Sequence, residues 1–280
     1  MADEPIIAIS GLRFTYAGSD RPALDGIDLQ IMRGEFVGVM GPNGAGKTTL
    51  GLSLNGIVPH MIIGQQGGEV RVGGLDPTTV PVREMARTVG MVFDNPEFQM
   101  SQATAADEVA LGLENLGVPS GEMPARIAEA LQIVGLEGVE DRSPMGLSGG
   151  EQQRLAIASV LAMRPSILFM DEPTSSLDPR GKAQVFEIAR RLNREEGMTV
   201  IVAEHDVEVL AEFADRVVVL SEGRIALQGP PSEVLGRVVA LDAIGLRSPQ
   251  VTEFAHAVSG APAGLPVTVD ATLAWLAARR

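Results

Sequence analysis

Short apolar runs alternate with longer segments of helical periodicity along most of the chain. This alternation is typical of an α/β domain built on a largely parallel sheet. Several runs are apolar throughout, as expected for strands that are buried on both faces. The predicted strands are Ile6–Ser10, Phe36–Met40, Thr88–Phe93, Ile167–Met170, Thr199–Ala203 and Val217–Leu220. The predicted helices are Thr48–Asn55, Ala105–Leu116, Pro124–Val134, Gly150–Met163, Gly181–Glu195 and Val207–Phe213.

The two ends of the chain depart from this pattern. The part up to about Val72 is richer in strands and turns, which predicts a smaller antiparallel sheet packed beside the main one. Near the C-terminus, the segments GLRSP and SGAPAGLP interrupt the alternation and precede a short predicted helix, Ala271–Arg279. We therefore expect one large domain over residues 1–240 and a small extension over residues 241–280.

Composition narrows the possible functions. The chain has 280 residues, no cysteine and a net charge of −14. The lack of cysteine excludes disulfides, thiolate zinc sites and cysteine nucleophiles, and it fits a reducing cytosolic compartment. The negative charge would repel nucleic acid and anionic lipid, although it also aids solubility. No apolar run approaches the roughly 18 residues of a membrane span, and the start MADEPIIAIS does not resemble a signal peptide.

One glycine-rich segment matches the phosphate-loop pattern GxxxxGK[ST]. It reads Gly41-Pro42-Asn43-Gly44-Ala45-Gly46-Lys47-Thr48-Thr49, between the apolar run FVGVM and a predicted helix, which is the required strand–loop–helix context. Its backbone N–H groups and the helix N-terminus suit phosphate oxygens. Lys47 is expected to reach the β- and γ-phosphates of ATP, and the Thr48 hydroxyl to bind Mg²⁺. The alternative is a glycine-rich turn without a ligand.

An acidic pair follows the apolar run that begins at Ser166. At the end of a buried strand, Asp171 can lie near the phosphate loop and hold magnesium through water. Glu172 is then placed to orient or deprotonate an attacking water molecule. Acidic residues also commonly begin loops, so this assignment depends on the phosphate loop nearby.

The segment Leu147-Ser148-Gly149-Gly150-Glu151 stands just before a predicted helix. Exposed backbone amides of Ser148 and Gly149 would suit a phosphate. The same residues also form a capping pattern, with Ser148 as N-cap and Glu151 at the third helical position. The two interpretations are compatible with each other.

The string LSGGEQQRLAIASVL, followed by ILFMDEPTSSLD, resembles the ATP-binding subunit of ABC transporters. The resemblance covers roughly Ile6 to Leu235. It implies a P-loop NTPase of the ABC ATPase type, with a RecA-like core, an N-terminal antiparallel β subdomain and a helical signature subdomain over about residues 95–163. It also implies a head-to-tail dimer, in which the signature segment Leu147 to Glu151 contacts ATP held by the phosphate loop of the second subunit.

The resemblance implies roles for further residues. Ser176, Leu177 and Asp178 match the D-loop, which crosses the dimer interface. His205 matches the switch histidine that contacts the γ-phosphate, although a single histidine after a strand is more often structural. Tyr16 matches an aromatic residue that stacks on adenine, with strand packing as the alternative.

The segment VFDNPEFQMSQATAADEVALGLENLGVP resembles the ATPases of energy-coupling-factor importers, the uptake group for vitamins and transition-metal ions. In the ABC family, a glutamine after the strand that here reads VGMVF contacts magnesium. This chain has Asp94 at that position, and a carboxylate can also offer an oxygen to the metal. Gln99 and Gln102 lie nearby and are alternatives for the glutamine role.

The resemblance also implies partners. The chain would form a homodimer, or a heterodimer with a second ABC ATPase, at the cytoplasmic face of the membrane. A groove along Asp94–Leu116 would receive coupling helices of a transmembrane scaffold, and a separate membrane protein would capture the substrate. Phe98 and Met100 are candidate contacts, or else core residues. The alternatives are an ATPase of another ABC transporter class, a soluble ABC ATPase of DNA repair or translation, and a non-hydrolysing sensor. Glu172 and His205 argue against the sensor.

Overall fold

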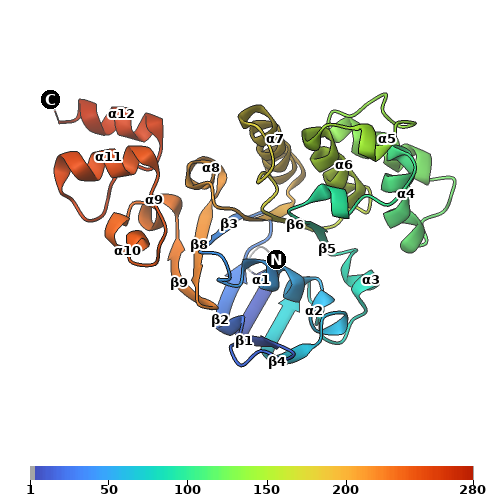
Figure 1. Ribbon diagram of the computed structural model, residues 1–280, viewed down its shortest axis with the longest axis horizontal. Helices are drawn as coiled ribbons and strands as arrows, with labels where there is room; N and C mark the ends of the chain where they lie inside the picture. The colour runs from blue at the N-terminus through green and yellow to red at the C-terminus, as the bar shows by residue number, and fades with distance from the viewer. Residues whose placement is uncertain (1–3, 280) are drawn as a thin grey trace.

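A six-stranded sheet forms the centre of the molecule in the computed structural model, which describes residues 4–279 (Figure 1). The strand order is β5-β6-β7-β3-β8-β9, in which the first five strands are parallel and β9 is antiparallel to β8. The strands are β3 (Phe36–Met40), β5 (Val89–Val92), β6 (Ile167–Asp171), β7 (Thr199–Ala203), β8 (Arg216–Ser221) and β9 (Arg224–Gly229).

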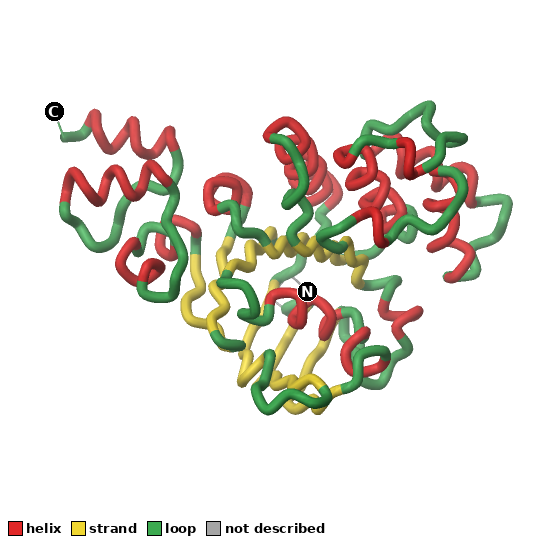
Figure 2. The backbone as a smooth tube through the Cα atoms, in the orientation of Figure 1, coloured by secondary structure: helices red, strands yellow, loops and turns green. Residues whose placement is uncertain are grey.

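The burial of the central strands explains their apolar sequences. Every residue of β3, β6 and β7 is buried. These strands lie between helices on one face and a second layer of structure on the other (Figure 2). The predicted strands Phe36–Met40 and Thr199–Ala203 coincide with β3 and β7. The edge strand β9 was not predicted, because its residues alternate between exposed and half-buried positions.

A second, antiparallel sheet with the order β2-β1-β4 packs beside the main sheet, as predicted for the N-terminal part. Its strands are β1 (Ile7–Tyr16), β2 (Leu24–Ile31) and β4 (Gly64–Val72). β1 is longer than the predicted Ile6–Ser10, because a bulge between Ile9 and Leu12 changes its register and its apolar pattern resumes afterwards. The predicted α/β class is confirmed.

Most helices before residue 200 pack into one of two apolar clusters. Helix α1 packs in one apolar cluster with both sheets, through Leu50 and Leu54. Helices α4, α5 and α6 gather at one end of the molecule (Figure 1) and share a second cluster with α7. The helices are α1 (Lys47–Leu54), α2 (Ile57–His60), α3 (Val82–Met85), η1 (Pro96–Phe98), α4 (Ala105–Asn115), α5 (Met123–Ile133), η2 (Pro144–Gly146), α6 (Gly149–Leu161), α7 (Pro179–Glu196) and α8 (Val207–Phe213).

The C-terminal segment contains more helix than the sequence predicted. Its helices are α9 (Pro231–Val234), α10 (Val238–Asp242), α11 (Gln250–Ser259) and α12 (Val269–Ala277). Leu241 and Val267 pack with Leu210 of α8 and Val219 of β8 in a third apolar cluster. The predicted domain boundary after residue 240 remains a prediction. Between residues 4 and 279, no helix is both long enough and apolar enough to cross a membrane.

Candidate nucleotide site

The carboxyl ends of three neighbouring strands bring the predicted catalytic residues together. β3 leads into the phosphate loop, β6 ends at Asp171 with Glu172 directly after it, and β7 leads to His205. β7 lies between β6 and β3 in the sheet, so the three strand ends are adjacent. This edge is where open parallel sheets usually bind their ligands.

Two glycines of the phosphate loop occupy positions that exclude a side chain. Gly46 is the N-cap of α1 with a φ of 106°, and a Cβ added there would lie 2.6 Å from the Ala23 carbonyl oxygen. A Cβ at Gly41 would lie 2.3 Å from the Leu220 carbonyl oxygen. This packing fixes the loop at the N-terminus of α1, where unpaired backbone N–H groups favour an anion.

The Lys47 ammonium group lies at the centre of the site. Its Nζ donates a hydrogen bond to the Gly41 carbonyl oxygen at 2.9 Å, and lies 3.2 Å from His205 Nε2 and 3.6 Å from Glu172 Oε1. A buried ammonium requires polar or negative partners, which the loop and the neighbouring strand ends provide. A terminal phosphate of a nucleotide offers oxygens that can replace these contacts.

Glu172 and His205 form a pair across the ends of β6 and β7. Glu172 Oε1 lies 2.8 Å from His205 Nε2, and the Glu172 N–H donates to the Ala203 carbonyl oxygen at 2.8 Å. The φ of Glu172 is 46°, a left-handed conformation that is strained for a residue with a side chain. Such strain persists only where neighbouring structure enforces it, and it is concentrated at functional sites.

Asp171 lies deeper than Glu172. It is 4% exposed, and its Oδ1 has no hydrogen-bond partner within residues 4–279. Burial raises the pKa of the Asp171 carboxyl group, the Thr48 hydroxyl lowers it, and the negative charges of Glu172 and Asp94 raise it further. The positive charge of Lys47 lowers this pKa and is outweighed by the burial and the two acidic neighbours.

These oxygen donors fit a magnesium ion that is shared with a triphosphate. Thr48, Asp171 and Asp94 offer the hard oxygen ligands that magnesium prefers. In the described part of the chain, no group of three or more His, Cys, Asp or Glu side chains could hold a metal ion. Magnesium is commonly bound by one or two carboxylates together with phosphate oxygens, so this donor set matches that mode.

Tyr16 lies at the end of β1, beside the phosphate loop. Its hydroxyl forms a 2.8 Å hydrogen bond with Thr49 Oγ1, and its ring packs edge-on against Phe14 with 5.0 Å between the ring centroids. Tyr16 thus packs against a strand residue, as one interpretation expected, and also contacts the helix that follows the loop. Stacking on adenine remains a prediction.

The signature segment forms the capped start of α6. Ser148 Oγ accepts from the Glu151 N–H at 3.4 Å, and Glu151 Oε2 accepts from the Ser148 N–H at 2.8 Å, which completes a capping box. The bond from the Ser148 hydroxyl to Glu151 is the main cause of a lowered pKa of the Glu151 carboxyl group. Ser148 and Gly149 are exposed, and because Gly149 has no side chain, its exposure shows that the backbone is accessible there.

The signature segment and the predicted D-loop face the same pocket of about 510 Å³. Asp178 is the N-cap of α7, where its Oδ1 accepts from the Gly181 N–H at 2.7 Å. The residues that these two motifs contribute to the pocket are Ser148, Gly149, Gly150, Glu151, Ser176, Leu177 and Asp178. The phosphate loop does not line this pocket, so these motifs form a surface of their own on this chain.

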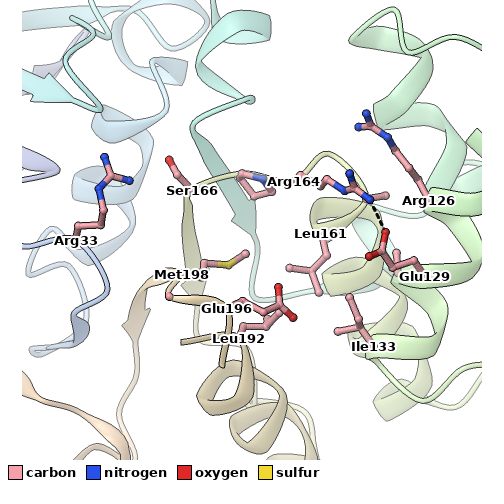
Figure 3. Close-up of a pocket in the computed structure, with 14 residues that line it drawn as sticks. Arg33, Arg126, Glu129, Ile133, Leu161, Arg164, Ser166, Leu192, Glu196 and Met198 are labelled. Carbon is pink, nitrogen blue, oxygen red and sulfur yellow. Dashed lines mark hydrogen bonds and ion pairs between the residues drawn. The ribbon is translucent and has the colours of Figure 1, made fainter. Parts of the chain in front are cut away.

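Another pocket, of about 470 Å³, lies at the opposite edge of the sheet (Figure 3). Ser166 and Met198, which line it, directly precede β6 and β7. Its three arginines are Arg33, Arg126 and Arg164. Helices α5, α6 and α7 end around this pocket, where Arg164 pairs with Glu129 at 2.7 Å. The pocket shares no residue with the predicted nucleotide site.

Sequence reasoning did not identify Glu204 and Thr174. Both side chains are buried, and Thr174 Oγ1 donates to Glu204 Oε2 at 2.8 Å. The two residues are 30 positions apart in the chain, and the only signal available was that Glu204 lies between β7 and His205. The contact depends on the pairing of β6 with β7.

The fold and the site together define a P-loop ATPase with an α/β core. The family model described as ABC transporter matches residues 24–175, and this chain belongs to the ABC transporter ATP-binding family. The predicted family, the ABC-type fold and the ATPase class are confirmed.

Three similar proteins support the energy-coupling-factor branch and the dimeric family fold. The chain is 43% identical over 278 residues to the energy-coupling factor transporter ATP-binding protein EcfA1 of Symbiobacterium thermophilum, with 95% of this chain and 93% of that protein covered. It is similar to cbiO1 of Clostridium perfringens, part of the ABC transporter complex cbiONQ, at 32% identity and a TM-score of 0.75, covering 90% of this chain and 99% of that one. It is also similar to the ATP-binding cassette MJ0796, solved as a dimer with ADP and phosphate, at 29% identity and a TM-score of 0.70, covering 80% and 98%.

Some relatives are longer than this chain. The match to an ABC transporter ATP-binding relative from Caldanaerobacter subterraneus is 46% identical over 272 residues, which is 96% of this chain but 48% of that protein. The chain therefore spans about half the length of this relative.

Proposed function

We propose that this chain is the ATP-hydrolysing subunit of an energy-coupling-factor type importer for a vitamin or a transition-metal ion. The observation that carries the proposal is the convergence of Lys47, Glu172 and His205 at the carboxyl edge of the sheet. The identity to EcfA1 over nearly the whole chain supports the branch.

ATP binding begins at the phosphate loop. The backbone amides at the start of α1 and the Lys47 ammonium bind the β- and γ-phosphates, while Tyr16 stacks on the adenine. Thr48, Asp171 and Asp94 would hold Mg²⁺, which when bound offsets phosphate charge. As the γ-phosphate attracts Lys47 and His205, the Glu172 carboxylate loses its present partners and becomes available to a water molecule.

Hydrolysis uses the freed carboxylate. Glu172 orients the attacking water and accepts its proton, and His205 contacts the γ-phosphate. Lys47 and the loop amides stabilise negative charge on the phosphoryl group during its transfer to water. The arrangement of the three side chains in one cluster supports this division of roles.

The complete site requires two subunits. Ser148 and Gly149 lie exposed at the start of α6, which suits the γ-phosphate of ATP held by a second ABC ATPase, in a homodimer or a heterodimer. The D-loop residues Ser176, Leu177 and Asp178 share that surface. The dimeric structure of MJ0796 supports this arrangement.

A groove beside the helical subdomain is proposed to receive coupling helices of a transmembrane scaffold. It has a volume of about 580 Å³, and Val82, Leu111 and Met163 are among its apolar lining residues. Met100 is 8% exposed and belongs to the core, whereas Phe98 is 89% exposed beside the groove. Met100 lines the groove floor with little exposed surface, so Phe98 is the candidate contact that offers most surface to a partner.

In this proposal the chain works at the cytoplasmic face of the membrane, and a separate membrane protein captures the substrate. The membership of cbiO1 in the complex cbiONQ supports the membrane partners. No role for nucleic acid is proposed, since the net charge of −14 opposes binding to phosphate backbones.

Two measurements test the proposal. Purified chain should release phosphate from ATP in the presence of magnesium, and Lys47→Ala should abolish this release. Co-expressed with a transmembrane scaffold protein of an energy-coupling-factor importer, the chain should co-purify with it in detergent. An active chain that associates with DNA or ribosomes instead would favour the soluble ABC ATPases.

A further inference from the structure

A buried carboxylate lies between β7 and His205 and binds the backbone of the loop that carries the histidine. Glu204 is 4% exposed, and its Oε1 accepts from the His205 N–H at 2.8 Å and the Asp206 N–H at 3.3 Å. The Glu204 N–H donates to the Val39 carbonyl oxygen at 3.0 Å, so the residue also pairs with β3. The main chain before and at His205 is thereby fixed.

The second oxygen of the same carboxylate reaches a different part of the site. Glu204 Oε2 accepts from Thr174 Oγ1 at 2.8 Å, and Thr174 is fully buried. Thr174 lies in the turn between Glu172 and the predicted D-loop, and its carbonyl oxygen accepts from the Leu177 N–H at 3.1 Å. One side chain therefore connects the histidine loop to the turn that links Glu172 with the D-loop.

We infer that Glu204 is a positioning residue, which orients the His205 imidazole toward Lys47 and Glu172 and couples that orientation to the D-loop turn. The inference rests on the proposed role of His205 in ATP hydrolysis. Within residues 4–279, the Glu204 side chain makes no hydrogen bond to Lys47 or Glu172. It acts through the backbone of His205 and through Thr174.

The physical basis is the way in which the buried charge is satisfied. The hydrogen bonds to Glu204 come from two backbone amides and one hydroxyl, and no Lys or Arg ion pair to it is found within residues 4–279. Bonds from amides and hydroxyls to a carboxylate are strong and directional. Glu204→Gln keeps one oxygen but places an NH₂ group against a donor, so one side of the connection must break.

Histidine NMR can observe the predicted effect, because the chain has only three histidines, His60, His205 and His256. In nucleotide-free protein with labelled histidine, Glu204→Gln should shift or broaden the His205 imidazole resonances and leave those of His60 and His256 in place. Glu212→Gln, the same change on the exposed side of α8, should leave all three unchanged. Unchanged His205 resonances in Glu204→Gln would overturn the inference.

Kinetics provides the second measurement. Glu204→Gln should lower kcat by about 10- to 100-fold with ATP affinity changed by less than about threefold, because small displacements of a reacting group have effects of this size. If Glu204→Gln disturbs all three histidines, Thr174→Val is used in the kinetic comparison instead. Thr174→Ser, which keeps the hydroxyl, is its control. Equal kcat in these two variants would reject the coupling to the D-loop turn. A wild-type chain without ATPase activity would instead reject the proposed function, and the NMR comparison would still test the positioning.

Discussion

At the residue scale, the Glu172 carboxylate carries the proposed activation of water. Glu172→Gln keeps the shape of the side chain but removes the proton acceptor, so kcat should fall by about 100- to 10,000-fold while ATP binding persists. Phosphate release and fluorescent-nucleotide binding measure the two properties. Glu187→Gln, an exposed position on α7, is the matched control and should behave as wild type. Turnover near the wild-type rate in Glu172→Gln would remove Glu172 from the mechanism.

We expect the buried Asp171 to lower the free energy of unfolding of the nucleotide-free protein and to contribute to magnesium binding. Burial raises the pKa of its carboxyl group, so the ionised carboxylate is less stable in the folded state than in the unfolded state. The cost in folding stability therefore begins as the pH rises through the pKa of the unfolded state and is complete above the raised pKa of the folded state. Asp171→Asn should raise the thermal midpoint at neutral pH without nucleotide and magnesium, and should lose magnesium-dependent ATPase activity. A lowered midpoint would contradict this account.

Asp94 adds a negative charge near the proposed triphosphate site, and it already contributes to the raised pKa of Asp171. Asp94→Gln removes that charge and keeps an oxygen donor. We expect it to retain ATPase activity and to reach half-maximal rate at a lower magnesium concentration, since less positive charge is needed to offset the site. Magnesium titrations of the ATPase rate measure this. An unchanged titration curve would show that Asp94 is remote from the metal.

At the scale of elements, the loop between β5 and α4 contains both a proposed partner contact, Phe98, and a core residue, Met100. Phe98→Ala should change the free energy of unfolding by less than about 0.5 kcal/mol, because Phe98 is exposed, yet it should weaken co-purification with the membrane scaffold. Met100→Ala should destabilise by about 2–5 kcal/mol, because Met100 packs in the core. Chemical denaturation and detergent pull-down measure the two effects. Normal co-purification of Phe98→Ala would show that Phe98 does not contact the scaffold.

How far the sequence predicted the structure depends on where the determining contacts lie. β3, β7 and α8 were predicted to the residue, because continuous apolar runs define the two strands and local helical periodicity defines the helix. The phosphate loop, Asp171 and Glu172 were also recognisable from local motifs. β9 and α11 were missed, because their amphipathic patterns are short and half exposed. The Glu204–Thr174 contact could not be predicted, since it exists only after β6 and β7 pair.

At the scale of the whole molecule, the chain divides the proposed chemistry between two surfaces. The phosphate loop, Glu172 and His205 lie at one edge of the sheet, and the signature segment lines a separate pocket with the D-loop. A single chain therefore offers two incomplete halves. Head-to-tail pairing would bring the phosphate loop of one chain against the signature segment of another, which makes hydrolysis depend on association.

This dependence can be tested by mixing two inactive variants. Lys47→Ala removes the phosphate-loop cation, and Gly149→Glu places a negative charge on the signature segment, so each homodimer should be inactive. In a mixed dimer, the intact phosphate loop of the Gly149→Glu chain meets the intact signature segment of the Lys47→Ala chain, and one of two sites is restored. Random pairing in equal amounts should recover about a quarter of the wild-type rate, if pairing is symmetric and unbiased. The recovered rate should rise with chain concentration until the dimer is saturated. Activity in Gly149→Glu alone would show that each chain hydrolyses ATP without its partner's signature segment. No recovery on mixing, despite demonstrated heterodimers, would show that the two halves do not combine.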